Sequence, residues 1–251
     1  MCVYMVLDDH EIEDNWSMDR LPAKAPLYAA AMQAYHAYQV VHGPAFDPAA
    51  GTPKNHWYKF RSGCADVFVL DTRTERLREA SPPRIVSEAQ LEALKSWLKA
   101  DSEGVKFVVT SVPFFPDTRR RSDDRWDGFE AQRLEILDFI REHQIRRVVF
   151  LSGDVHCSMA AQLRCSTDPD FLVTSIVSSA FYWFLPHTSP EQFDLSGLLA
   201  QSGASVYTVE NASDVYPKDM FTRVSVTPEE VVVKFYERKG ALLGERTFSF
   251  R

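Results

Sequence analysis

The sequence predicts an α/β fold in a single domain over residues 1–251. Two observations predict it. Apolar, β-prone segments alternate with amphipathic helical segments as far as residue 151, which is the order expected of a sheet layered with helices. Beyond that point, β-prone segments follow one another with short polar turns between them, which indicates a second sheet. No repeat, low-complexity tract or linker divides the chain, so we expect both sheets in one domain.

The first part of the chain contains three of these elements. Val3–Leu7 is a continuous β-prone run, typical of a buried central strand, although it stands at the very start of the chain. Pro26 can open a helix with apolar residues at three- and four-residue spacing, and Gly43 is its expected stop. Consecutive apolar residues within 64–71 predict a strand buried on both faces, with Arg73 just beyond its carboxyl end.

Two helices and two strands are expected between residues 87 and 151. Ser87 begins a capping box that leads into an amphipathic helix, and residues 107–110 form the strand that follows. The prolines and charges of residues 113–125 predict a long loop. A second amphipathic helix starts near Gly128 and leads into a strand at residues 148–151. The remaining strands are expected at residues 171–177, 224–226, 231–236 and 247–250.

The composition is that of an ordinary globular domain, and it excludes several classes of protein. A net charge of −7 argues against a surface that binds nucleic acid nonspecifically. No apolar stretch reaches the roughly 18 residues needed to span a bilayer, and no signal-peptide pattern stands at the N-terminus. The sequence predicts neither an oligomeric state nor a cellular location. We expect the cysteines to be free thiols, because they form no CxxC pair: Cys2, Cys64, Cys157 and Cys165.

Two loops carry the residue types that hold metal ions, and each follows a predicted buried strand. The first is the run Asp8–Glu11, and the second contains Asp154 and His156. Hard cations in hydrolytic sites take carboxylate and imidazole ligands from several loops at the carboxyl ends of strands. Closely spaced acids repel one another, and a bound cation relieves that repulsion. A polar loop at the N-terminus of a helix would also account for the acidic run taken alone. The other histidines stand outside any such motif and are expected in surface or packing roles: His36, His42, His56, His143 and His187.

Four segments resemble, in order, motifs of the alkaline phosphatase D-like members of the metallophosphoesterase superfamily: Leu7–Trp16, Phe68–Arg73, Asp124–Gly128 and Leu151–His156. The first and the last are specific, whereas the middle two are weak when taken alone. The resemblance covers most of the chain. It implies an α/β/β/α sandwich of two mixed sheets flanked by helices. It also implies hydrolysis of phosphomonoesters or phosphodiesters by a metal-activated water.

The resemblance implies roles for individual residues. Asp9 matches a metal ligand, and Asp8 is a further candidate ligand. His10 matches a histidine that contacts the leaving group, which it would protonate or steady. The superfamily's Gly-His-x-His loop, which supplies one ligand to each metal, resembles Gly153–His156 here, with Asp154 in place of its first histidine and His156 as its second. Because a carboxylate is a harder ligand than an imidazole, the site favours calcium, iron(III), magnesium or manganese over zinc. Resemblance to the best-known members implies iron and calcium.

Other residues are candidates for binding the substrate, which we expect to be a small phosphate ester. Arg73 and Arg125 can clamp phosphate oxygens. A structural pairing of Arg73 with Asp71 is equally compatible with the sequence. Trp126 and Trp183 can line the mouth of the cleft, and core packing is the alternative for both.

The N-terminal end departs from the family pattern. A complete site of this kind draws further ligands from two loops that precede the strand before Asp8, including a Gly-Asp loop, and this sequence begins after them. Together with a buried strand as the first element, this predicts a partial, N-terminally truncated domain. On that view, the chain binds metal weakly, is poorly active, and exposes sheet edge and apolar surface. The alternative function is a noncatalytic ligand-binding or interaction module that keeps the fold with an incomplete metal site.

Overall fold

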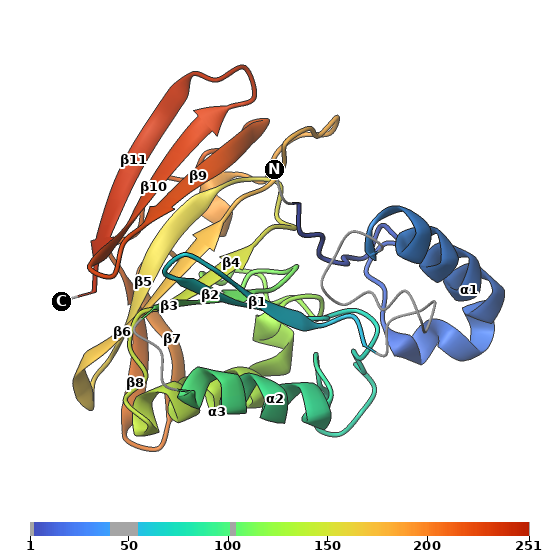
Figure 1. Cartoon of the computed structure of the whole chain (residues 1–251), viewed down its shortest axis with the longest axis horizontal. Coiled ribbons are helices and arrows are strands. Elements are labelled where there is room, and N and C mark those ends of the chain that lie inside the picture. Colours follow the sequence, from blue (N-terminus) through green and yellow to red (C-terminus); the bar gives the residue numbers. More distant parts are fainter. Residues whose placement is uncertain (1–2, 41–54, 101–103, 251) are drawn as a thin grey trace.

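The structure, a computed structural model, describes residues 3–40, 55–100 and 104–250 and contains two stacked sheets with helices outside them (Figure 1). The strands of the larger sheet are β1 Tyr58–Ser62, β2 Ala65–Val69, β3 Val105–Val109, β4 Val148–Ser152, β5 Met159–Cys165, β6 Asp168–Val177, β7 Gly197–Ser202 and β8 Ser205–Glu210. Their order is β1-β2-β3-β4-β6-β5-β8-β7. Neighbours from β2 to β6 in this order are parallel, and antiparallel strands complete both edges, so the sheet is mixed.

Two helices cover one face of the larger sheet (Figure 1). They are α2 (Glu88–Lys99) and α3 (Glu130–Glu142). Leu94 of α2 and Ile136 of α3 are fully buried in one apolar cluster with side chains of the sheet. The Ser87 side chain accepts a hydrogen bond from the first turn of α2 at 3.2 Å, which confirms the predicted N-cap.

The smaller sheet packs on the opposite face of the larger one (Figure 1). Its strands β9 (Met220–Val226), β10 (Glu230–Glu237) and β11 (Leu242–Ser249) are antiparallel, in the order β11-β10-β9. Successive strand residues point to opposite faces, so in β2 Val67 joins the cluster between the sheets while Phe68 joins the cluster beneath the helices. The predicted α/β fold class, with its two sheets and flanking helices, is confirmed.

Helix α1 (Leu21–Tyr38) stands to one side of the sheets (Figure 1) and begins earlier than predicted. A 3-10 turn, Met18–Arg20, leads into it, and Pro22 takes the first-turn position that the prediction assigned to Pro26. Pro26 instead follows a break in the helical backbone angles at Lys24. The predicted start was wrong because two prolines lie close together and the earlier one opens the helix.

The prediction of a buried central strand at Val3–Leu7 is also wrong. The segment runs beside β1, where Tyr4 stacks on Phe60 with 3.7 Å between ring centroids and Tyr58 donates a hydrogen bond to the Met5 carbonyl at 2.8 Å. A β-prone run becomes a strand only when a neighbour completes its hydrogen-bond ladder, and no strand of the described chain pairs with this one. Its last residue, Leu7, is buried in the apolar cluster beneath α1.

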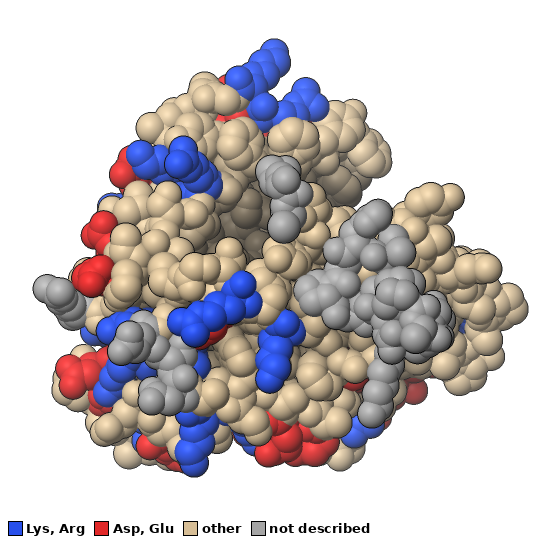
Figure 2. Space-filling view, in the orientation of Figure 1, with Lys and Arg blue, Asp and Glu red and all other residues tan. Residues whose placement is uncertain are grey.

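Other predictions concern the chain as a whole. Cys64, Cys157 and Cys165 are free thiols, as expected. No helix within the described ranges is long and apolar enough to cross a membrane. On the face drawn in Figure 2, basic and acidic side chains are interspersed. The predictions for Cys2, His42 and Gly43 lie outside the described residues.

Candidate active site

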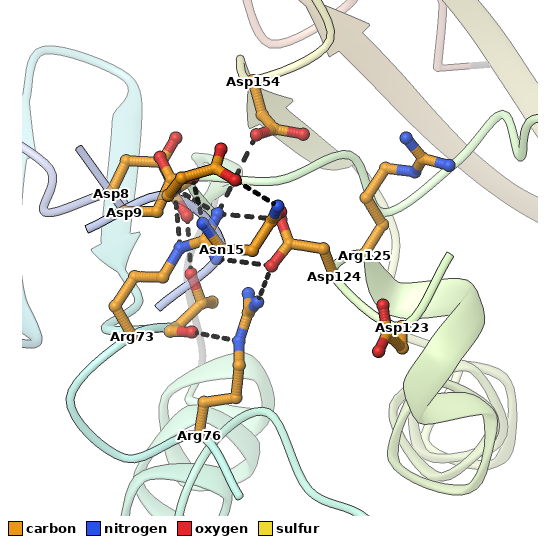
Figure 3. Close-up of polar contacts among 12 residues, drawn as sticks. Asp8, Asp9, Asn15, Arg73, Arg76, Asp123, Asp124, Arg125 and Asp154 are labelled. Atoms are coloured by element: carbon orange, nitrogen blue, oxygen red, sulfur yellow. Dashed lines mark hydrogen bonds and ion pairs between the residues drawn. The ribbon is translucent and has the colours of Figure 1, made fainter. Parts of the chain in front are cut away.

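The predicted acidic residues meet beyond the carboxyl ends of the parallel strands. Asp154 follows β4, and Arg73 follows β2. Asp8 and Asp9 reach the same place from the N-terminal segment (Figure 3). Ligand atoms of Asp8, Asp9 and Asp154 lie within 4.8 Å of one another. The structure therefore brings together three of the four residues that the sequence predicts as metal ligands.

The side chain of Arg73 is fully buried among these carboxylates (Figure 3). Its Nε donates to Asp8 Oδ1 at 2.8 Å, and its Nη1 donates to Asp124 Oδ1 at 2.7 Å. Its Nη2 lies 3.8 Å from Asp154 Oδ1. Burial opposes the charge of Arg73, but Asp8 and Asp124 outweigh this effect and hold the pKa of Arg73 above its usual value. The alternative partner, Asp71, accepts from the backbone N–H of Arg73 at 3.0 Å.

Asp124 and Arg76 extend this buried ion-pair network. Arg76 Nη1 donates to Asp124 Oδ1 at 2.5 Å, and Arg76 Nε donates to the Thr72 carbonyl at 2.8 Å. Burial and the charge of Arg73 lower the pKa of Arg76 to about 10. For Asp124, burial acts to raise the pKa, but the charges of Arg76 and Arg73 outweigh burial, so the pKa of Asp124 lies below its usual value. The motif Asp124–Gly128 pointed toward Asp124, whereas no sequence signal marks Arg76.

Asp9 is fixed by the backbone of its own loop. Its Oδ1 accepts from the N–H of His10 and its Oδ2 accepts from the N–H of Asn15, both at 2.8 Å. Asn15 adopts a left-handed backbone conformation, with φ of 54°, as the loop turns back toward Asp9. The His10 side chain is exposed, and its Nε2 lies 3.6 Å from Asp14 Oδ1. The loop thus holds Asp9 in place and leaves the His10 imidazole accessible.

The pKa of Asp154 is raised to about 7. Burial is the largest cause, and the negative charges of Asp8 and Asp124 add to it, while Arg73 acts in the opposite direction. A buried carboxylate beside other carboxylates is stabilised either by a proton or by a bound cation. Oxygen ligands in this number and spacing suit a hard cation. The described residues therefore include acidic groups that could hold a metal.

His156 stands beside the three carboxylates. Its ring stacks on Trp183, with 3.7 Å between centroids and 19° between planes. Burial, then the neighbouring His187 and His10, lowers the pKa of His156. Its backbone is left-handed, with φ of 53°, and its N–H donates to Ser179 Oγ at 3.1 Å. Within the described chain, His156 lines the same cleft as the carboxylates but is not among the ligand atoms grouped within 4.8 Å.

A cleft of about 390 Å³ opens beside this cluster. Its wall contains the predicted ligands and, among other residues, His10, Asp124, Arg125 and Trp183. Arg125 Nη2 donates to Thr118 Oγ1 at 2.5 Å. Figure 3 shows the Arg125 guanidinium apart from the carboxylates, with no contact drawn between them.

The prediction that Trp126 lines the cleft is wrong. Its side chain is fully buried, its ring lies edge-on to Phe114 at 5.0 Å, and its Nε1 donates to Thr110 Oγ1 at 3.1 Å. An apolar surrounding with one hydrogen-bond partner for the indole N–H is the usual setting of a core tryptophan. Trp126 therefore follows the packing alternative, whereas Trp183 does line the cleft.

Comparisons with known proteins identify the family. A family model described as PhoD-like phosphatase matches residues 1–214. Alkaline phosphatase D of Bacillus subtilis (strain 168) is 29% identical over 208 residues, which cover 68% of this chain and 35% of that protein. The solved structure of PhoD superposes with a TM-score of 0.68 at 19% identity, over 96% of this chain and 50% of that one, and shows the same fold. The chain thus spans half or less of the length of these relatives. Because the family model matches most of the chain, the chain belongs to the PhoD-like phosphatase family.

Proposed function

We propose that the cleft is a site for metal-dependent hydrolysis of a phosphomonoester or phosphodiester. The observation that carries this function is the convergence of Asp8, Asp9 and Asp154 on one cleft wall, in a chain of the PhoD-like family. The name of the Bacillus subtilis relative, alkaline phosphatase D, supports a phosphate ester as the substrate class.

The carboxylates of Asp8, Asp9 and Asp154 would hold the metal, and the nearby His156 would complete the set. A set rich in oxygen fits Ca²⁺, Fe³⁺, Mn²⁺ or Mg²⁺ better than Zn²⁺. The likeness to alkaline phosphatase D favours calcium and iron. When bound, such a cation supplies Lewis acidity toward the phosphoryl oxygens and the attacking water.

The chain's own side chains divide the remaining tasks. His10 donates a proton to the leaving alkoxide oxygen, since its imidazole is exposed on the cleft wall. Arg125 offers its guanidinium to a phosphoryl oxygen in the same cleft. Arg73 is a positioning residue and not the phosphate clamp expected from the sequence, because it is fully buried and bound to Asp8 and Asp124.

Two substitutions in the 251-residue chain test this function. Asp154→Asn lowers the affinity for Mn²⁺ at least ~10-fold, and hydrolysis of chromogenic phosphate monoesters and diesters falls in parallel. His10→Ala lowers kcat about 100-fold or more, while the bound metal stays constant, because only proton transfer to the leaving group is lost. His143→Ala, on the exposed end of α3, is the control and leaves both quantities unchanged. Unchanged rates in both Asp154→Asn and His10→Ala would remove the cleft as the reaction site.

One observation favours the alternative, a noncatalytic ligand-binding module. Arg73 and Arg76 already neutralise part of the negative charge of the acidic residues, so the fold does not require a cation there. A chain that retains no Mn²⁺ in equilibrium dialysis yet binds inorganic phosphate by calorimetry, with Arg125→Ala abolishing the binding, would support this module over the hydrolase.

A further inference from the structure

His156 is held at its ring and at its backbone by one segment of the chain, residues 180–187, which follows β6. The ring lies almost flat on the indole of Trp183, at 3.7 Å and 19°. The His156 carbonyl lies 2.7 Å from Nδ1 of His187, and because a carbonyl oxygen only accepts, Nδ1 donates. The left-handed backbone of His156 is unfavourable for a residue other than glycine, and it persists only where the surroundings hold it.

The same segment is anchored to Asp219, the residue before β9. Asp219 Oδ1 accepts from the backbone N–H of Trp183 at 2.9 Å and lies 3.4 Å from Nε2 of His187. Arg238, in the turn after β10, donates its backbone N–H to the Asp219 carbonyl at 2.9 Å, and its Nη1 lies 3.8 Å from Asp219 Oδ2. Asp219 thus ties the loop beside His156 to the smaller sheet.

We propose that three residues orient the imidazole of His156 for metal binding: Trp183, His187 and Asp219. We call these residues the His156 support. Their contacts connect them, directly or through one another, to His156. His156 meets Trp183 through the stacked rings and His187 through its carbonyl, and both of these residues meet Asp219. Residues that fix the orientation of a ligand raise its affinity for the metal, because the ligand side chain loses less orientational freedom on binding. Since it takes His156 as a metal ligand, the His156 support rests on the proposed function.

Ordinary core packing does not account for the position of Trp183. Its sequence neighbours Phe181, Tyr182, Phe184 and Leu185 are between 51% and 74% exposed, so the segment has no core of its own to follow. Trp183 is the member of this run that lies in the cleft wall. Its contact with His156 is therefore the feature that distinguishes it within the segment.

A double-substitution cycle with Mn²⁺ as the probe tests the His156 support. Trp183→Ala removes the stacked ring and should weaken Mn²⁺ binding about 10–100-fold in calorimetric titrations. Trp183→Phe keeps a flat ring on the imidazole and should restore most of the affinity. In a His156→Ala background, Trp183→Ala should have no further effect, because it acts only through His156. Phe181→Ala, in the same segment, is the matched control and should bind Mn²⁺ like the unsubstituted chain.

If Trp183→Ala lowers the Mn²⁺ affinity by the same factor in the unsubstituted and the His156→Ala backgrounds, the His156 support is overturned. Unchanged Mn²⁺ affinity in Trp183→Ala while Asp154→Asn still weakens binding would also overturn it, and in that case the proposed function would stand. If the unsubstituted chain binds no Mn²⁺, or binds it as Asp154→Asn does, the proposed function fails and the support fails with it. If circular dichroism shows that Trp183→Ala does not fold, His187→Ala takes its place in the same cycle, since it removes one hydrogen bond to the His156 carbonyl.

Discussion

Two walls of the cleft are held in place by different interactions. In the acidic wall, Asp8, Asp9 and Asp124, the fully buried guanidinium of Arg73 binds Asp8 at 2.8 Å and Asp124 at 2.7 Å. Asp9 is held by the backbone of its own loop. The histidine wall, the loop from Asp154 to His156, is held by the stacked ring of Trp183 and by single hydrogen bonds to Ser179 and His187. The apolar side chains on either side of Trp183 are exposed. The acidic wall is therefore part of the folded core, whereas the histidine wall is attached to it. Substitutions in the acidic wall should lower the free energy of unfolding. Substitutions in the histidine wall should mainly change the geometry of the site.

The largest expected effect is in the acidic wall. Arg73→Met keeps much of the side-chain volume but leaves Asp8 without its buried partner and Asp124 with Arg76 as its remaining buried partner, and should lower the free energy of unfolding by about 3–5 kcal/mol. Urea unfolding monitored by circular dichroism measures it. Arg164→Met is the matched control, because its pair with Glu210 is largely exposed and should contribute at most about 1 kcal/mol. Equal, small losses in the two variants would mean that the acidic wall is not held by its ion pairs.

A pH titration sharpens the same point at Asp124. Burial would raise its pKa, but Arg76 and Arg73 outweigh burial and hold the folded-state pKa below the ordinary 3.8. Its contribution to stability is therefore present above pH 3.8 and is lost as the pH falls through the lower, folded-state pKa, by at most about 1.4 kcal/mol per pH unit. Asp124→Asn should be less stable than the unsubstituted chain near neutral pH, and the two unfolding free energies should converge in acid.

The neighbouring Asp123 supplies the control for this titration. Its side chain is exposed and pairs with Arg78, so Asp123→Asn should change the free energy of unfolding near neutral pH by at most about 1 kcal/mol. A stability difference for Asp124→Asn that stays constant from neutral to acidic pH would show that its carboxylate charge is not what stabilises the acidic wall.

The smallest effect is expected in the histidine wall. Ser179→Ala removes the acceptor of the His156 N–H and should cost about 1 kcal/mol in urea unfolding. The Mn²⁺ affinity should fall by more than the roughly fivefold change that corresponds to about 1 kcal/mol, because the loop that carries His156 loses one of its attachments. Ser189→Ala, at an exposed hydroxyl, should change neither quantity. A stability loss as large as that of Arg73→Met would remove the distinction between the two walls.

Local pattern was sufficient to predict the elements that position the site. Uninterrupted apolar residues within 64–71 and 148–151 predicted buried strands, and these became β2 and β4 of the parallel core. Acidic residues that follow such strands lie at one edge of a sheet, and Asp154 follows β4 as expected, whereas Asp8 reaches the same place from a segment that is not a strand. The same pattern predicted a strand at Val3–Leu7, and that prediction was wrong because strand formation depends on a partner strand and not on composition alone.

Pairings across long stretches of chain could not be predicted from local pattern. Arg76 meets Asp124 across 48 residues, and Trp183 meets Asp219 across 36, without any periodic signal that links them. Trp126 and Trp183 both stand beside loops of the cleft, yet one packs in the core and the other lines the wall. Their difference arises from the direction in which the backbone turns each ring, and tertiary packing sets that direction.

The buried guanidiniums also set the charge that the cleft presents to a cation. With every group ionised, the four carboxylates of Asp8, Asp9, Asp124 and Asp154 stand against the two guanidiniums of Arg73 and Arg76, which leaves two negative charges. A single divalent cation would bring this group to neutrality. A trivalent cation would leave it with one positive charge, and the same pocket that attracts cations would then attract a phosphate dianion.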